Sequence, residues 1–103
     1  MKVKVESEKI LKAVKKLHGV EIVLENPHDA KEAINLILTK TDLFKANDYE
    51  KLRDVKVTSF QEYKTSAVDY KMVFLLEFLF EDNVSLETKV AVIKELQDFF
   101  ARV

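Results

Sequence analysis

Residues 68–80 read VDYKMVFLLEFLF, and this stretch decides the fold that we expect for the chain. Its apolar residues recur at every second position, and alternate side chains of an extended strand point to the same face of a sheet. The continuous apolar face comprises Val68, Tyr70, Met72, Phe74, Leu76, Phe78 and Phe80. The opposite face is also apolar in its middle, at Val73, Leu75 and Leu79. A strand that is apolar on both sides is predicted to lie inside a sheet, with its aromatic content favouring strand over helix.

The segments before this strand predict further elements. Val3 and Val5 alternate with charged residues, which indicates a short half-buried strand. A helix is expected over residues 8–17 from the helical spacing of its apolar residues, with Gly19 providing the left-handed stop after it. Residues 20–24 then form a second, largely buried strand.

The remaining elements are predicted from capping residues and periodicity. Residues 26–29 read NPHD, with Asn26 as a cap, and start a second helix that is expected to run to about Thr39. A third strand is expected over residues 55–64, and a final helix begins after Ser85 as its cap. The inner stripe of that helix is predicted to comprise Leu86, Val90, Ile93, Leu96 and Phe100.

The sequence therefore predicts a single α+β domain over residues 1–103, with the element order β-α-β-α-β-β-α. We expect a mixed sheet of about four strands, with two to three helices packed on one face. That face is the one that carries Phe74, Leu76 and Phe78. A scarcity of turn residues, with one glycine and one proline in the chain, argues against a sandwich or barrel.

Composition limits the chemistry that the chain can perform. Cysteine is absent, which excludes disulfides, thiolate metal sites and thiol nucleophiles. A single glycine cannot form the glycine-rich loop that brings backbone N–H groups to a phosphate. Net charge is −1, and no apolar run is long enough to span a bilayer. We therefore expect a cytoplasmic protein with no membrane association and no small-molecule cofactor.

Candidate catalytic residues are few and widely spaced. The two histidines, His18 and His28, lack the spacing of a metal site and are interpreted as capping or surface residues. Glu77 interrupts the apolar strand, and we interpret its face as exposed at that point or helped by Lys71, with a perturbed functional acid as the alternative. We predict that the protein is not an enzyme. A site assembled from Glu77, Tyr63 and a histidine is kept as the enzymatic alternative.

The leading functional hypothesis is a non-enzymatic protein-interaction module. It would be an assembly, adaptor or inhibitor protein of the kind that phages and other mobile elements encode, presenting a strand edge or a helix face to a partner or to its own copy as a homo-oligomer. The residues expected to contact a protein partner are Phe78, Phe80, Val92, Phe99 and Val103. The alternative is a nucleic-acid-binding protein that uses a lysine face of the first helix. That face comprises Lys9, Lys12, Lys15 and Lys16.

Overall fold

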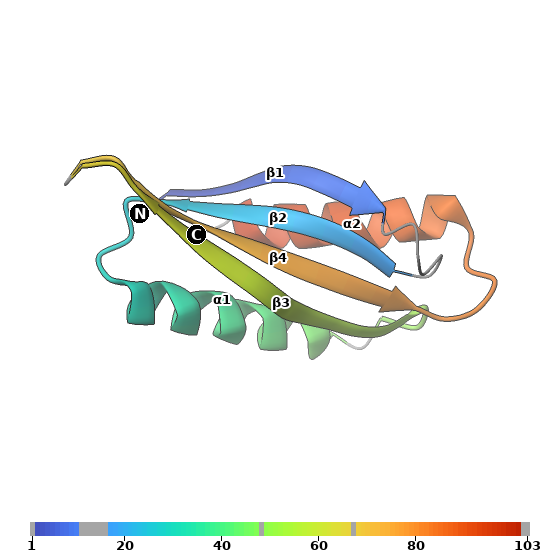
Figure 1. The fold of residues 1–103 in the computed structure, drawn as a ribbon. Coiled ribbons are helices and arrows are strands. Elements are labelled where there is room, and N and C mark those ends of the chain that lie inside the picture. The colour runs from blue at the N-terminus through green and yellow to red at the C-terminus, as the bar shows by residue number, and fades with distance from the viewer. Residues whose placement is uncertain (1, 11–16, 48, 67, 102–103) are drawn as a thin grey trace.

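The computed structural model describes residues 2–10, 17–47, 49–66 and 68–101, which form an α+β fold (Figure 1). Its elements are β1 (Lys2–Ile10), β2 (Leu17–Glu25), α1 (Ala30–Lys45), β3 (Leu52–Lys64), β4 (Tyr70–Phe80) and α2 (Leu86–Ala101). The prediction of an α+β class is confirmed. The element order is ββαββα, so the predicted order, which began β-α-β, is wrong.

The four strands of the described sheet lie in the order β1-β2-β4-β3, and every neighbouring pair is antiparallel. The prediction of a mixed sheet is therefore wrong. A parallel pair needs a long crossover such as a helix, whereas neighbouring strands joined by a short connection pair antiparallel. Strand β1 pairs antiparallel with β2, the next strand along the chain, as β3 does with β4.

Neither end of the helix predicted over residues 8–17 is helical. Residues 8–10 belong to β1 and Leu17 to β2, and Glu8 is paired in register with Val20. Gly19 lies within β2 and does not have a positive φ. Residues 11–16 lie outside the described part of the chain. At residues 8–10, pairing with β2 outweighs the local helical spacing, since tertiary context routinely overrides weak propensities.

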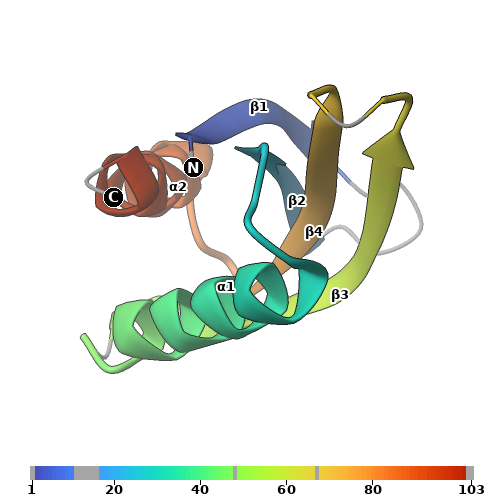
Figure 2. The same ribbon diagram turned by 90° about the vertical axis from the view of Figure 1, so that its left-hand side faces the viewer.

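Both helices cover the same face of the curved sheet (Figure 2). Helix α1 packs along β3, and α2 packs along β1. The alternation predicted for the fourth strand is confirmed from Met72 to Phe80, where even-numbered residues are buried and odd-numbered residues are half-buried. Val68, predicted on the buried face, lies before β4 and is 83% exposed. The register sets this buried face beside Val20, Ile22 and Leu24 of β2.

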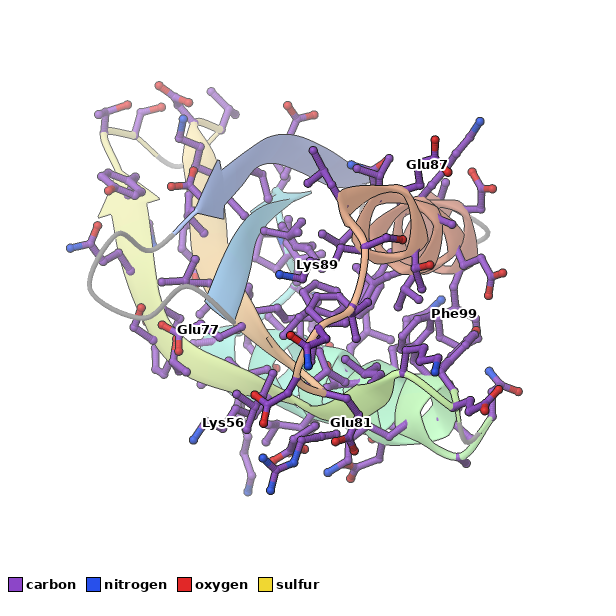
Figure 3. The ribbon with its side chains drawn as sticks, turned by 90° about the vertical axis from the view of Figure 1, so that its right-hand side faces the viewer. Lys56, Glu77, Glu81, Glu87, Lys89 and Phe99 are labelled. Carbon is purple, nitrogen blue, oxygen red and sulfur yellow. The ribbon has the colours of Figure 1, made fainter. Side chains whose placement is uncertain are left out.

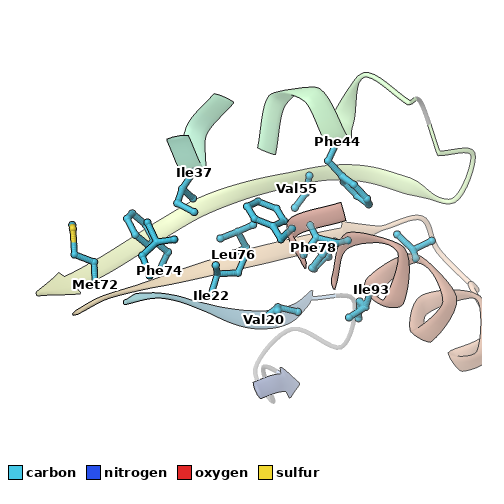
Figure 4. Close-up of a cluster of buried hydrophobic side chains, with 14 of the residues drawn as sticks. Val20, Ile22, Ile37, Phe44, Val55, Met72, Phe74, Leu76, Phe78 and Ile93 are labelled. Atoms are coloured by element: carbon cyan, nitrogen blue, oxygen red, sulfur yellow. The ribbon is translucent and has the colours of Figure 1, made fainter. Parts of the chain in front are cut away.

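The hydrophobic core lies between this face and the two helices (Figure 4). Its largest fully buried side chains include Phe44, Phe74, Phe78, Phe80 and Phe100. Burying one such side chain contributes about 1.5–3 kcal/mol relative to leaving it exposed, so these aromatic residues account for much of the stability of the fold.

Helix α1 begins later and ends later than predicted. Its N-cap is Asp29, whose carboxylate accepts a hydrogen bond of 2.8 Å from the backbone N–H of Glu32. Asn26, predicted as the cap, instead has a φ of 51° in the loop before the helix. The helix continues to Lys45 because no glycine or proline interrupts it and Phe44 extends its buried stripe.

Helix α2 is capped as predicted, but the face that it buries differs from the predicted one. The hydroxyl of Ser85 accepts a hydrogen bond of 3.2 Å from the backbone N–H of Thr88. Leu86 and Val90 are exposed, whereas the buried stripe comprises Val92, Ile93, Leu96 and Phe100. The apolar arc of this helix is wider than the surface it buries, so periodicity alone did not fix its rotation.

Phe99 lies between the two helices (Figure 3). Its ring centroid is 5.9 Å from that of Phe44, and the Nζ atom of Lys40 lies 4.9 Å from the Phe99 ring centroid. The same ammonium group donates a hydrogen bond of 3.4 Å to the backbone carbonyl of Phe99, so a cation from α1 meets a carbonyl near the end of α2. Burial lowers the pKa of Lys40 from its ordinary value.

Candidate protein-interaction groove

Strand β3 forms one edge of the described sheet, and its second half is exposed to solvent. Residues 58–64 are all exposed, and β3 pairs only with β4 in that sheet. An edge strand leaves alternate backbone N–H and C=O groups without a partner strand on its outer side. Such a strand is a template for pairing with another chain.

A bulge at Thr58 determines which side chains of β3 face the helices. The register with β4 shifts between Val57 and Ser59, and the Thr58 hydroxyl donates a hydrogen bond of 3.3 Å to the backbone carbonyl of Leu75. One extra residue reverses the alternation beyond it. Phe60 is therefore opposite Phe74 on the helix-covered face, whereas regular alternation from Val57 would place it on the other face.

Phe60 closes one side of an apolar groove between β3 and α1. The groove has a volume of about 450 Å³. Its lining comprises Ile34 and Leu38 from α1, Val57, Thr58, Ser59 and Phe60 from β3, and Phe74 from β4. The ring centroids of Phe60 and Phe74 are 5.7 Å apart, so the exposed ring continues the buried aromatic layer. Leu38 is 46% exposed and Phe60 is 45% exposed, which leaves apolar surface open directly beside the strand edge.

Charged residues lie beyond the groove in both directions along β3 without lining it. Where α1 ends and β3 begins, the Nζ atom of Lys45 lies 2.8 Å from a carboxylate oxygen of Asp54. The hydrogen bond from Lys45 lowers the pKa of Asp54, and the same bond raises the pKa of Lys45. At the other end, burial chiefly raises the pKa of the Tyr70 phenol, and the negative charges of Glu62 and Asp29 raise it further. The Lys64 ammonium lies 5.5 Å from the centroid of the Tyr70 ring, so both signs of charge are present there, while Asp54 is neutralised by its partner.

The helix-free face of the sheet carries Glu77 and Tyr63, two residues of the enzymatic alternative. Glu77 is half-buried on this face. Its register partner on β3 is Lys56, so the cation beside it comes from the neighbouring strand and is not the predicted Lys71 (Figure 3). Tyr63 is paired with Lys71. Glu77 and Tyr63 are therefore on the order of 20 Å apart along the strands, and the geometry does not bring them into one site.

The residues predicted to contact a protein partner are mostly inside the core. Phe78 and Phe80 have no exposed surface, and Val92 is only 8% exposed, so the expectation that they form surplus surface is corrected. They are buried because they belong to the core between the sheet and the two helices. Phe99 is half-buried between the helices, and Val103 lies outside the described residues.

The predicted lysine face has no helix to carry it in the described part of the chain. Lys9 lies in β1, and Lys12, Lys15 and Lys16 lie outside the described residues. His18 lies in β2, paired in register with Phe78, and His28 is exposed just before α1.

One cluster of possible metal ligands occurs in the described residues, formed by His28, Asp29 and Glu32 within 4.8 Å of one another. All three are exposed, and the Asp29 carboxylate already caps α1. The capping bond explains this arrangement without an ion.

The groove was missed in the sequence because its key residues are separated along the chain. Leu38 was predicted as one more apolar residue of a helix, and Phe60 as part of a loosely bounded strand. One signal was present: the alternation of Val55 and Val57 changes phase before Phe60. Such a change is what a bulge produces.

Comparison of the chain with protein-family models, with curated proteins and with solved structures finds no match. None of the described helices has the length and apolar character needed to cross a membrane.

Proposed function

We propose that this protein is a binding module that captures an extended segment of another polypeptide at the edge of β3. The segment adds a strand to the sheet and places an apolar side chain in the groove between β3 and α1. The observation that carries this proposal is the position of an open apolar groove directly beside an exposed strand edge.

Strand addition divides recognition between two kinds of contact. Backbone hydrogen bonds along the edge supply affinity for any extended segment, and pockets for alternate side chains supply selectivity. Here the edge is provided by residues 58–64 and the pocket by Leu38, Phe60 and their neighbours. The groove lies within the size range of small ligand sites, which are roughly 300–1,000 Å³, so it accommodates an apolar side chain with part of its backbone.

The test is selection of peptides from a random display library on the immobilised protein. Leu38→Glu places a charge in the groove, and Leu43→Glu is the matched control, because Leu43 is also on α1, is 57% exposed and does not line the groove. Covering the exposed half of a leucine contributes about 1 kcal/mol, and a carboxylate in its place adds a desolvation cost. Selected peptides should therefore bind Leu38→Glu at least about tenfold more weakly than wild type, and Leu43→Glu like wild type.

Two outcomes would contradict the proposal. Equal binding to both variants would show that the groove is not used. A concentration-dependent dimer in sedimentation that disappears in Leu38→Glu would show that the groove is occupied by a second copy of the chain rather than by a peptide.

A further inference from the structure

The strand edge carries an acidic side chain beside the groove. Phe60 and Glu62 are paired in register with Phe74 and Met72, which are both buried on the helix-covered face. Residues two apart on a strand share a face, so the Glu62 carboxylate emerges on the same side of β3 as the Phe60 ring. Glu62 is exposed and lies two residues beyond Phe60, the last residue of β3 that lines the groove.

This carboxylate is not neutralised by an ion pair in the described residues. The ion pairs found there join Lys45 to Asp54 and Arg53 to Glu81, and Glu62 takes part in neither. The nearest lysine along β3, Lys64, has its Nζ atom 5.5 Å from the centroid of the Tyr70 ring. Burial chiefly raises the pKa of Tyr70, and the negative charges of Glu62 and Asp29 raise it further, although the Lys64 ammonium lies over the same ring.

The other carboxylate of β3, that of Asp54, is held in an ion pair. Asp54 is held 2.8 Å from Lys45, and the pair is close to neutral as a unit. Of the two carboxylates on β3, only that of Glu62 takes part in no ion pair within the described part of the chain. A partner strand that is complementary to this edge has an apolar side chain over the groove and a cation beside Glu62.

We infer that the segment captured at β3 carries lysine or arginine two positions from the apolar residue that fills the groove. This inference rests on the proposed function. The spacing follows from strand geometry, because Phe60 and Glu62 are two residues apart and the side chains of a paired strand that face them are also two apart, in either strand direction.

The experiment uses the peptides selected on the wild-type protein. Each peptide is synthesised with its own sequence and with glutamate replacing the basic residue, and binding is measured by fluorescence anisotropy at low salt. Against Glu62→Lys, the basic peptide should bind about two- to fivefold more weakly and the glutamate peptide more tightly, as expected when an exposed ion pair is reversed. Glu50→Lys is the control, because it makes the same change in net charge at an exposed turn residue before β3. It should leave the preference unchanged.

The possible failures are distinguishable. Selected peptides that depend on Leu38 but have no basic residue at this spacing would overturn the inference and leave the proposed function standing. Equal losses with Glu62→Lys and Glu50→Lys would do the same, because they would indicate only long-range charge. If no selected peptide depends on Leu38, the proposed function fails, and the cation preference fails with it.

Discussion

Replacing Phe78 by alanine should destabilise the fold far more than replacing its neighbour Leu79. Phe78 has no exposed surface, and its ring is stacked on that of Phe80 with centroids 6.0 Å apart. Removing a fully buried phenylalanine costs about 3–5 kcal/mol, because both transfer free energy and packing are lost. Leu79 is half-buried on the helix-free face, so Leu79→Ala should cost about 1 kcal/mol.

Urea unfolding followed by circular dichroism measures both free energies. With a denaturant slope of about 1–3 kcal/mol/M, Phe78→Ala should lower the midpoint by on the order of 2 M and Leu79→Ala by well under 1 M. Phe78→Leu, which keeps most of the buried volume, extends the comparison if the alanine variant does not fold. Equal losses at positions 78 and 79 would refute the assignment of the two faces of β4, and with it the placement of the helices.

The Lys45–Asp54 pair should make stability depend on pH. The pKa of Asp54 is lowered in the folded state, so its stabilisation is present above the ordinary value of 3.8 and is lost as the pH falls through the folded pKa. Both side chains are substantially exposed, so the pair contributes little. When unfolding is measured at a series of pH values, Asp54→Asn should reduce the loss of stability on acidification by less than about 1 kcal/mol. Asn83 has a φ of 61°, so Asn83→Val should cost about 1–2 kcal/mol in chemical denaturation while Asn83→Gly costs little; equal effects would contradict the strain argument. Asp29→Ala should cost about 1 kcal/mol through loss of the α1 cap, and a thermal midpoint unchanged from wild type would argue against that cap.

Local patterns in the sequence predicted the interior of the fold well. The alternation through residues 70–80 identified the central strand and both of its faces, because burial on one side repeats at every second residue. Ser85 identified the start of α2 through its capping oxygen. These features are local, so the residues that specify them are adjacent in the chain.

Features that depend on distant partners were not predictable in the same way. Residues 8–10 join β1 only because β2 offers a pairing edge, and the wrong helix there led to the wrong sheet type. The rotation of α2 depends on what it packs against, which leaves Val90 exposed. The groove combines Leu38 and Phe60 from separate elements across a bulge, and no single segment of the sequence contains it.

The most direct measurement of strand capture at β3 is amide hydrogen exchange, compared with and without a bound selected peptide. Alternate amides of residues 58–64 have no partner strand on the outer side of the described sheet, so they should exchange rapidly in the free protein and slow by at least about tenfold when the peptide binds. Slowing that is absent from residues 58–64 and confined to β1 would contradict the account.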